Sequence, residues 1–285
     1  MRPPGPLATA LLVARLTLVE VVRGRAARGL LVVSAALLAL FALAAHQALG
    51  AARGRGGTVT VDVVGGTLLG SAAFVALLLG ATVAGTLTAS AVRGDAERGA
   101  LGPLAARPVS RLAIVLGRTL AGAGLAAAFA IALWLTSVLV VRIAGDWSPP
   151  ALAGPALALG GAVALVALGG TVVSTALPTT AATIAVLATV GVGLSVGLVA
   201  QLGSAFGLAD LRTVADVAAA LLPFEALYRH VLASLSDGRD LAAVGVAIGP
   251  FGGARELAAW HGPALTAWVT TGLALVAWRV RRTDV

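Results

Sequence analysis

The chain has 285 residues, of which 59% are hydrophobic and 11% are charged, and its mean hydropathy is +1.00. Soluble domains carry about 25% charged residues, so this composition excludes a soluble enzyme, a disordered chain and a fibrous repeat. All 20 basic residues are Arg, and the chain has no Lys or Cys. Schiff-base enzymes, thiol nucleophiles, disulfides and the lysine of a phosphate-binding loop are therefore excluded. We expect a membrane protein that is not an enzyme and that holds no cofactor or metal.

Six stretches without acidic or basic side chains are long enough, or nearly so, to cross the roughly 30 Å hydrocarbon core of a bilayer. They are uniformly apolar rather than alternating at period two, which favours helices over a barrel. We predict an all-α polytopic membrane protein with one transmembrane domain, residues 1–285. Its six spans cover about 29–50, 66–91, 112–141, 151–177, 181–203 and 262–280. The charged prefix 1–28 argues against a signal peptide.

The Arg residues are distributed unequally between the two sides of this topology. The prefix, the loop between the second and third spans and the C-terminus hold 13 Arg and four acids, a net charge of +9. The other side holds seven Arg and eight acids, a net charge of −1. Because cytoplasmic loops are rich in basic residues, we expect both termini in the cytoplasm and the protein in the plasma membrane of a bacterium. This bias also accounts for the overall charge of +8. The charge therefore does not indicate nucleic-acid binding, which needs clustered basic patches.

The predicted outer side has two contrasting segments. Residues 51–65 form a short Gly-rich loop, whereas 204–261 is long and contains two short amphipathic helices, Leu208–Leu222 and Phe224–Leu235, separated at Pro223. In the second helix Glu225 pairs with Arg229 at i,i+4. Its apolar face comprises Phe224, Leu227, Tyr228, Val231, Leu232 and Leu235. We expect these helices to lie on the outer membrane surface or to cap the bundle.

Polar residues inside the predicted spans are few. The uncharged cores of the six spans, which begin after Arg118 in the third span and end before Arg279 in the sixth, contain no Asp, Glu or Arg. We interpret His46 as an interfacial histidine. This argues against a proton-coupled transporter and a membrane protease, which need intramembrane ionisable residues. Hydroxyl groups either line a polar path or bond helix backbones and pack, and we favour packing. They include Thr82, Thr86, Thr136, Ser137, Thr171, Ser174, Thr175 and Ser195, and a G-x-x-x-G pair, Gly193 and Gly197, indicates close helix approach.

The predicted cytoplasmic loop 93–111 carries the strongest functional signal. If the loop were merely solvated, that would account for its Arg residues but for no other feature of it. Mere solvation does not explain a loop that opens with acids, turns, forms a short apolar segment and closes with bases. That order indicates a short helix along the inner membrane surface, with charges available to a cytoplasmic partner. The residues concerned are Asp95, Glu97, Arg98, Gly99, Arg107, Pro108, Val109, Ser110 and Arg111.

This loop resembles that of the permease subunits of type-two ABC exporters (the ABC-2-type transporter permease family), which reads like E-x-x-x-G-T-L-x-x-L-L-x-x-P-V-S-R. The matching residues are Glu97, Gly99, Leu101, Leu104, Pro108, Val109, Ser110 and Arg111, while Ala100 replaces Thr and Gly102-Pro103 interrupts the leucine-rich run. The segment 14–25, with Arg15, Glu20 and Arg23, looks like the N-terminal amphipathic interfacial helix of that class. The segment 278–285 looks like its apolar-x-R-R-x-D ending.

The resemblance implies a permease that forms the translocation pathway as a dimer, most simply a homodimer, in the lipid bilayer. It implies two ABC ATPase subunits, bound at the 93–111 loops, which hold the ATP and Mg²⁺. The importer motif E-A-A-x-x-x-G with its I-x-L-P tail is missing, which favours export. Lipids, drugs, peptides, haem-like compounds and metal-linked sulfur species stay open as substrates. The alternative is a non-transporting membrane scaffold or anchor that recruits a cytoplasmic protein.

Overall fold

A computed structural model of the chain describes residues 6–54, 58–91, 111–208, 220–235 and 259–282, with a few further positions between 210 and 217 and at 255 and 257. All regular structure in these residues is helical, as predicted. The helices are α1 (Pro6–Arg23), α2 (Arg25–Gly54), α3 (Thr58–Ala89), α6 (Arg111–Gly145), α7 (Ala153–Ser174), α8 (Thr179–Ala205), α10 (Pro223–Ser234) and α12 (His261–Arg282).

Five helices in the described part of the chain are long and apolar enough to cross a membrane. They are α2, Val61–Ala89 of α3, α6, α7 and Thr179–Val199 of α8. The protein is therefore a helical membrane protein. The sixth predicted span corresponds to α12, which has 22 residues and three Arg in its last turn. Because these Arg and several Thr lower its hydropathy, α12 is not one of the five.

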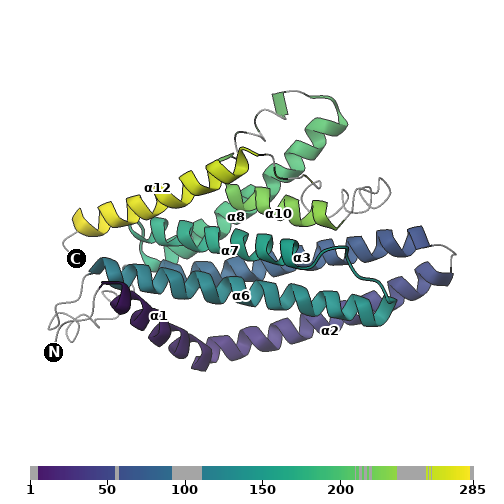
Figure 1. Cartoon of the computed structure of the whole chain (residues 1–285), viewed down its shortest axis with the longest axis horizontal. Helices are drawn as coiled ribbons and strands as arrows, with labels where there is room; N and C mark the ends of the chain where they lie inside the picture. Colours follow the sequence, from purple (N-terminus) through teal and green to yellow (C-terminus); the bar gives the residue numbers. More distant parts are fainter. Residues whose placement is uncertain are drawn as a thin grey trace.

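The centre of the bundle is formed by α3, α6 and α7, which lie side by side (Figure 1). In its most apolar stretch α7 has 67% of its residues buried, whereas α2 has 11%. Thus α7 is an interior helix and α2 a peripheral one. Leu69, Leu77, Trp134, Leu159 and Val163 form part of the core between the central helices. Helix α8 crosses the bundle obliquely (Figure 1).

The hairpin between α2 and α3 is tighter than predicted. Helix α2 continues to Gly54 and α3 begins at Thr58, so most of the predicted loop 51–65 is helical. A charged residue ends the hydrocarbon-spanning part of a helix without ending its backbone hydrogen bonds. Arg53 and Asp62 therefore lie within helices, and α2 and α3 extend beyond the predicted spans.

Trp147 lies in the connection between α6 and α7 and binds to α3. Its indole Nε1 donates a hydrogen bond of 2.8 Å to Oδ1 of Asp62. The ring lies against Gly65, where an added Cβ would be 2.5 Å from Cε3 of the indole. The preceding residue, Asp146, has a φ of 45° and turns the chain back toward the bundle. Only a glycine leaves space for the ring at position 65.

Helix α1 precedes α2 with a single residue, Gly24, between them. The Gly24 amide donates to the Val21 carbonyl at 3.0 Å, which closes the end of α1. The two helices meet at an angle, and α1 packs against the N-terminal part of α6 (Figure 1). The N-terminal segment is therefore part of the helical assembly.

Candidate functional site

The predicted partner-binding loop lies mostly outside the described residues, and this applies to Asp95, Glu97, Arg98, Gly99, Arg107, Pro108, Val109 and Ser110. Its last residue, Arg111, is the first residue of α6 and is exposed. The described part of this site is thus the N-terminal end of α6 and the helices packed around it.

Helix α1 packs closely on that end of α6. Gly117, in the second turn of α6, is buried, and an added Cβ there would lie 2.5 Å from the Ala10 carbonyl oxygen and 3.0 Å from Cβ of Val13. Such a distance leaves no room for a side chain at position 117. The contact therefore places the backbone of α1 directly against the helix that follows the predicted loop.

The charged residues predicted on the N-terminal helix all lie on α1. Arg15, Glu20 and Arg23 are exposed, as a surface available to headgroups or a partner requires. They do not form one polar face, however. They alternate with exposed apolar side chains, namely Leu11, Leu12, Leu16, Val19 and Val22. Helix α1 is therefore apolar both toward α6 and outward, which is less amphipathic than the sequence predicted.

Buried hydroxyl groups join the three central helices near this end. Thr119 of α6 and Thr171 of α7 form a hydrogen bond of 3.0 Å between their Oγ1 atoms. Thr88 of α3 is fully buried, and its side chain contacts Gly122 of α6 and Gly170 of α7. Small residues allow this close approach, and interhelical hydroxyl bonds add to helix association in membranes. The cluster holds α3, α6 and α7 together.

The hydroxyl groups of the predicted spans bond to the backbones of their own helices, which is one part of the interpretation favoured from the sequence. Each one donates to a backbone carbonyl three or four residues earlier, at 2.7–3.3 Å. This holds for Thr82, Thr86, Thr136, Ser137, Thr171, Ser174, Thr175 and Ser195. Such bonds satisfy the hydroxyl within its own helix, so these groups need no water-filled path.

Helix α10 is inserted into the bundle, so the alternative in which it lies on the membrane surface is wrong. Phe224, Tyr228 and Leu232 are buried, and α10 packs against α7, α3, α12 and α8. Glycines on three spans make room for it. Gly193 of α8 contacts the Phe224 ring, Gly161 of α7 faces Leu227, and Gly70 of α3 faces Leu232.

Helix α10 brings an ion pair into this apolar environment. Nε of Arg229 lies 3.2 Å from Oε1 of Glu225, and both side chains are buried, with 9% and 1% exposed. Burial, and then the nearby Glu225 carboxylate, raise the pKa of Tyr228 above its ordinary value, so the phenol keeps its proton. The sequence showed the i,i+4 spacing, but that spacing is also typical of exposed pairs. The burial of the pair was missed.

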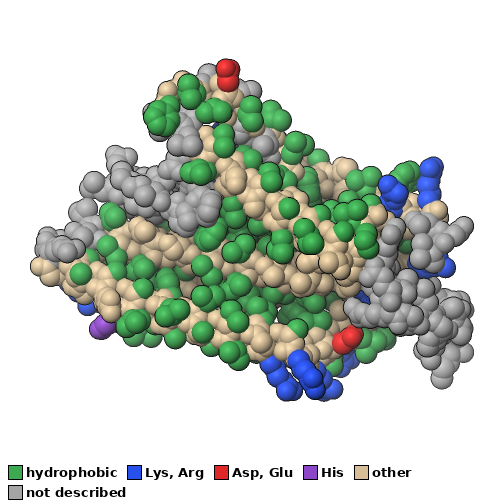
Figure 2. All heavy atoms as spheres, turned by 180° about the vertical axis from the view of Figure 1, so that it is seen from behind, with side chains coloured by type: hydrophobic (Ala, Val, Ile, Leu, Met, Phe, Trp, Pro, Cys, Tyr) green, Lys and Arg blue, Asp and Glu red, His purple; other side chains and the backbone are tan. Residues whose placement is uncertain are grey.

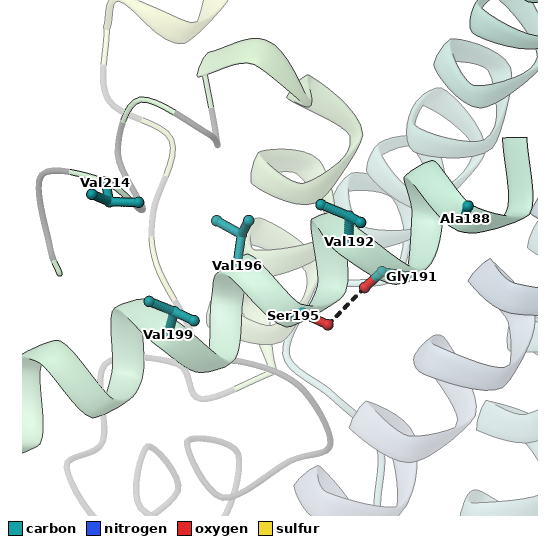
Figure 3. A pocket seen from close by; sticks show the side chains of 7 residues that line it. All are labelled: Ala188, Gly191, Val192, Ser195, Val196, Val199 and Val214. Atoms are coloured by element: carbon teal, nitrogen blue, oxygen red, sulfur yellow. Dashed lines mark hydrogen bonds between the residues drawn. The ribbon is translucent and has the colours of Figure 1, made fainter. Parts of the chain in front are cut away.

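An open groove of about 450 Å³ lies along α8 (Figure 3). It is lined by Ala188, Gly191, Val192, Ser195, Val196 and Val199 of α8 and by Val214. The Ser195 hydroxyl donates to the Gly191 carbonyl at 2.9 Å, so this lining group is already bonded. The groove therefore offers mainly apolar contact.

No protein-family model matches the chain, and no curated protein matches it. Among the described residues, no group of three or more His, Cys, Asp or Glu side chains forms a metal site.

Proposed function

We propose that this protein is the transmembrane permease subunit of an ATP-driven ABC transporter, most consistent with an exporter. The observation that carries the proposal is the contact of α1 with the second turn of α6 at Gly117. Helix α6 begins at Arg111, where the predicted coupling loop ends. A displacement of that loop would therefore move α6 and α1 together.

The proposed topology has six spans, with α12 as the sixth and both termini in the cytoplasm. It follows the charge split of +9 against −1. Two copies form the pathway, and two ATPase subunits bind at the 93–111 loops. A partner that binds two permease states with different affinity shifts the equilibrium between them. The ATPase would drive alternating access in this way, with nucleotide held entirely by the partner.

The charge order of the loop provides the test. Glu97→Arg with Arg98→Glu keeps the total charge, so membrane insertion is unchanged. If an ATPase docks there, the swap sets like charges against each other, which costs several kcal/mol across an interface, and ATPase copurification and transport are both lost. In a merely solvated loop the effect stays within about 0.5 kcal/mol. The matched control, Asp237→Arg with Arg239→Asp in the outer segment, leaves ATPase association unchanged.

The scaffold alternative is separated by ATP hydrolysis. A transporter requires hydrolysis by the associated ATPase to depend on this chain and to accompany substrate movement in vesicles. An anchor recruits its partner without that dependence. Retention of both ATPase binding and transport by the loop swap would show that the docking assignment is wrong.

A further inference from the structure

The last two turns of α12 bring one aromatic and two basic side chains together. The guanidinium carbons of Arg279 and Arg282 lie 5.5 Å and 4.7 Å from the centroid of the Trp278 ring. Trp278 is 45% exposed, and both Arg side chains are also exposed. Cation–π attraction holds guanidinium groups near an indole. Two positive charges are therefore held beside one amphipathic ring.

These residues belong to a continuous stripe on α12. Leu275, Trp278, Arg279 and Arg282 are spaced i, i+3, i+4 and i+7, which places them on one side of the helix. Leu275 is exposed as well, whereas Gly272 and Val276 are buried, Gly272 against Leu168 of α7. Along the stripe the side chains change from aliphatic to aromatic to basic. This is the order of environments along a phospholipid, from acyl chain to phosphate.

We propose that this stripe, Leu275–Arg282, binds an anionic phospholipid of the cytoplasmic leaflet. The Arg279 and Arg282 guanidiniums hold the phosphate, for which their planar donor geometry is suited. Trp278 lies at the interface, where tryptophan is enriched, and Leu275 contacts the acyl chain. The site rests on α12 being the sixth span with a cytoplasmic end, and it is independent of ATP-driven transport.

The surroundings favour a lipid over other uses of these residues. Figure 2 shows Arg side chains at the edge of a broad hydrophobic surface, on the side of the molecule where α12 ends. Cations at a helix C-terminus also offset the helix dipole, but that role needs neither an exposed indole nor an exposed Leu one turn earlier. A free phosphate would likewise leave the apolar half of the stripe unused.

Lipid binding by the purified protein tests the site. Native mass spectrometry in detergent, with added phosphatidylglycerol or phosphatidylcholine of the same chain length, should show preference for phosphatidylglycerol. Each Arg near an anionic surface raises the affinity for an anionic lipid by about fivefold. Arg279→Gln with Arg282→Gln should therefore weaken phosphatidylglycerol binding about 25-fold. The control Arg53→Gln with Arg142→Gln removes the same charge from exposed positions at the other end of the bundle and leaves binding unchanged.

A second measurement keeps the charges intact. Brominated phosphatidylglycerol should quench part of the tryptophan fluorescence of the wild-type protein, and Trp278→Phe should remove that part. Helical content and thermal unfolding of each variant establish that it is folded.

Four results would overturn the proposal. These are equal binding of the two lipids, an equal loss in the outer control, displacement of the lipid by inorganic phosphate alone, and unchanged quenching in Trp278→Phe. Loss of ATPase binding by the Arg279→Gln, Arg282→Gln protein with unchanged lipid binding would identify a protein-binding surface instead. A lowered unfolding temperature with unchanged lipid binding would reduce the two Arg to a role in helix stability.

Discussion

Glu225 and Arg229 are an unusual pair for a chain with so few charges, because both are buried among membrane helices. Ionisable residues in such surroundings pair with one another and mark functional sites by default. Glu225 also lies in the first turn of α10, where the helix dipole favours a negative charge. The pair, which lies within α10, thus lets the two charges compensate each other while the apolar side chains of the helix pack against α3, α7 and α8.

Glu225→Gln should destabilise the folded protein by about 3 kcal/mol, because the buried Arg229 charge loses its ionic partner. Glu225→Leu with Arg229→Met removes both charges and should cost less than the single change. Denaturant unfolding of the purified protein in detergent measures both. Equal losses in the single and double variants would show that the two charges are not coupled.

Gly65→Ala should lower stability by about 1–3 kcal/mol, the usual range for overpacking, because the added methyl group displaces the Trp147 ring. The hydrogen bond from Trp147 to Asp62 would be lost with it. Gly50→Ala on α2 is the matched control, since it meets nothing within 4 Å, and it should gain up to about 1 kcal/mol of helix propensity. The same unfolding assay compares them, and equal effects would refute the role of the ring.

Among the helices, the contact between α1 and α6 depends most on a single position. Gly117→Val should move α1 away from α6, because its side chain would occupy the space of the Ala10 carbonyl. The Cys-free chain allows a single Val13→Cys probe, whose labelling by a thiol reagent should become faster in the Gly117→Val protein. Gly124→Val, on an open part of the same helix, should leave the labelling rate unchanged. Slow labelling in both would contradict this packing.

The helical character of the chain was predictable because long uncharged stretches admit few other structures in a bilayer. The ends of the helices were not predictable, because Arg53 and Asp62 end the apolar stretches of the sequence without ending the backbone hydrogen bonds of the helices. The packing of Ser and Thr onto their own helices was also predictable, because the bond is local.

The depth of α10 could not be predicted in the same way. An i,i+4 ion pair has the same sequence pattern on a surface and in a core. In addition, the glycines that accommodate Phe224 and Leu232 lie on helices that are distant in the sequence. Likewise the contact of Gly117 with Ala10 joins segments about a hundred residues apart, so no local pattern indicates it. The predicted loop residues 95–110 lie outside the described part of the chain.

The arrangement of the chain in the membrane can be probed with single cysteines and an impermeant thiol reagent. With the outer side as proposed, Gly54→Cys and Asp237→Cys should be labelled in intact cells. Glu20→Cys and Thr283→Cys should react only after permeabilisation, the last because α12 crosses the membrane. Gly54 and Glu20 are both exposed, so burial does not confound the comparison. Labelling of position 283 in intact cells would remove α12 from the spans, and labelling of position 237 only after permeabilisation would invert the topology.

The one-residue joint at Gly24 has a mechanical consequence. Helix α2 has 30 residues, about 45 Å of stiff rod, and it is the least buried of the five long apolar helices. Near its far end, however, Ala45, Leu49 and Ala52 are buried, and Leu49 lies against Gly145 of α6. A stiff rod that is held at both ends and exposed in between acts as a strut. A push on α1 at one face of the membrane would thus be carried along α2 to the C-terminal end of α6 at the other face.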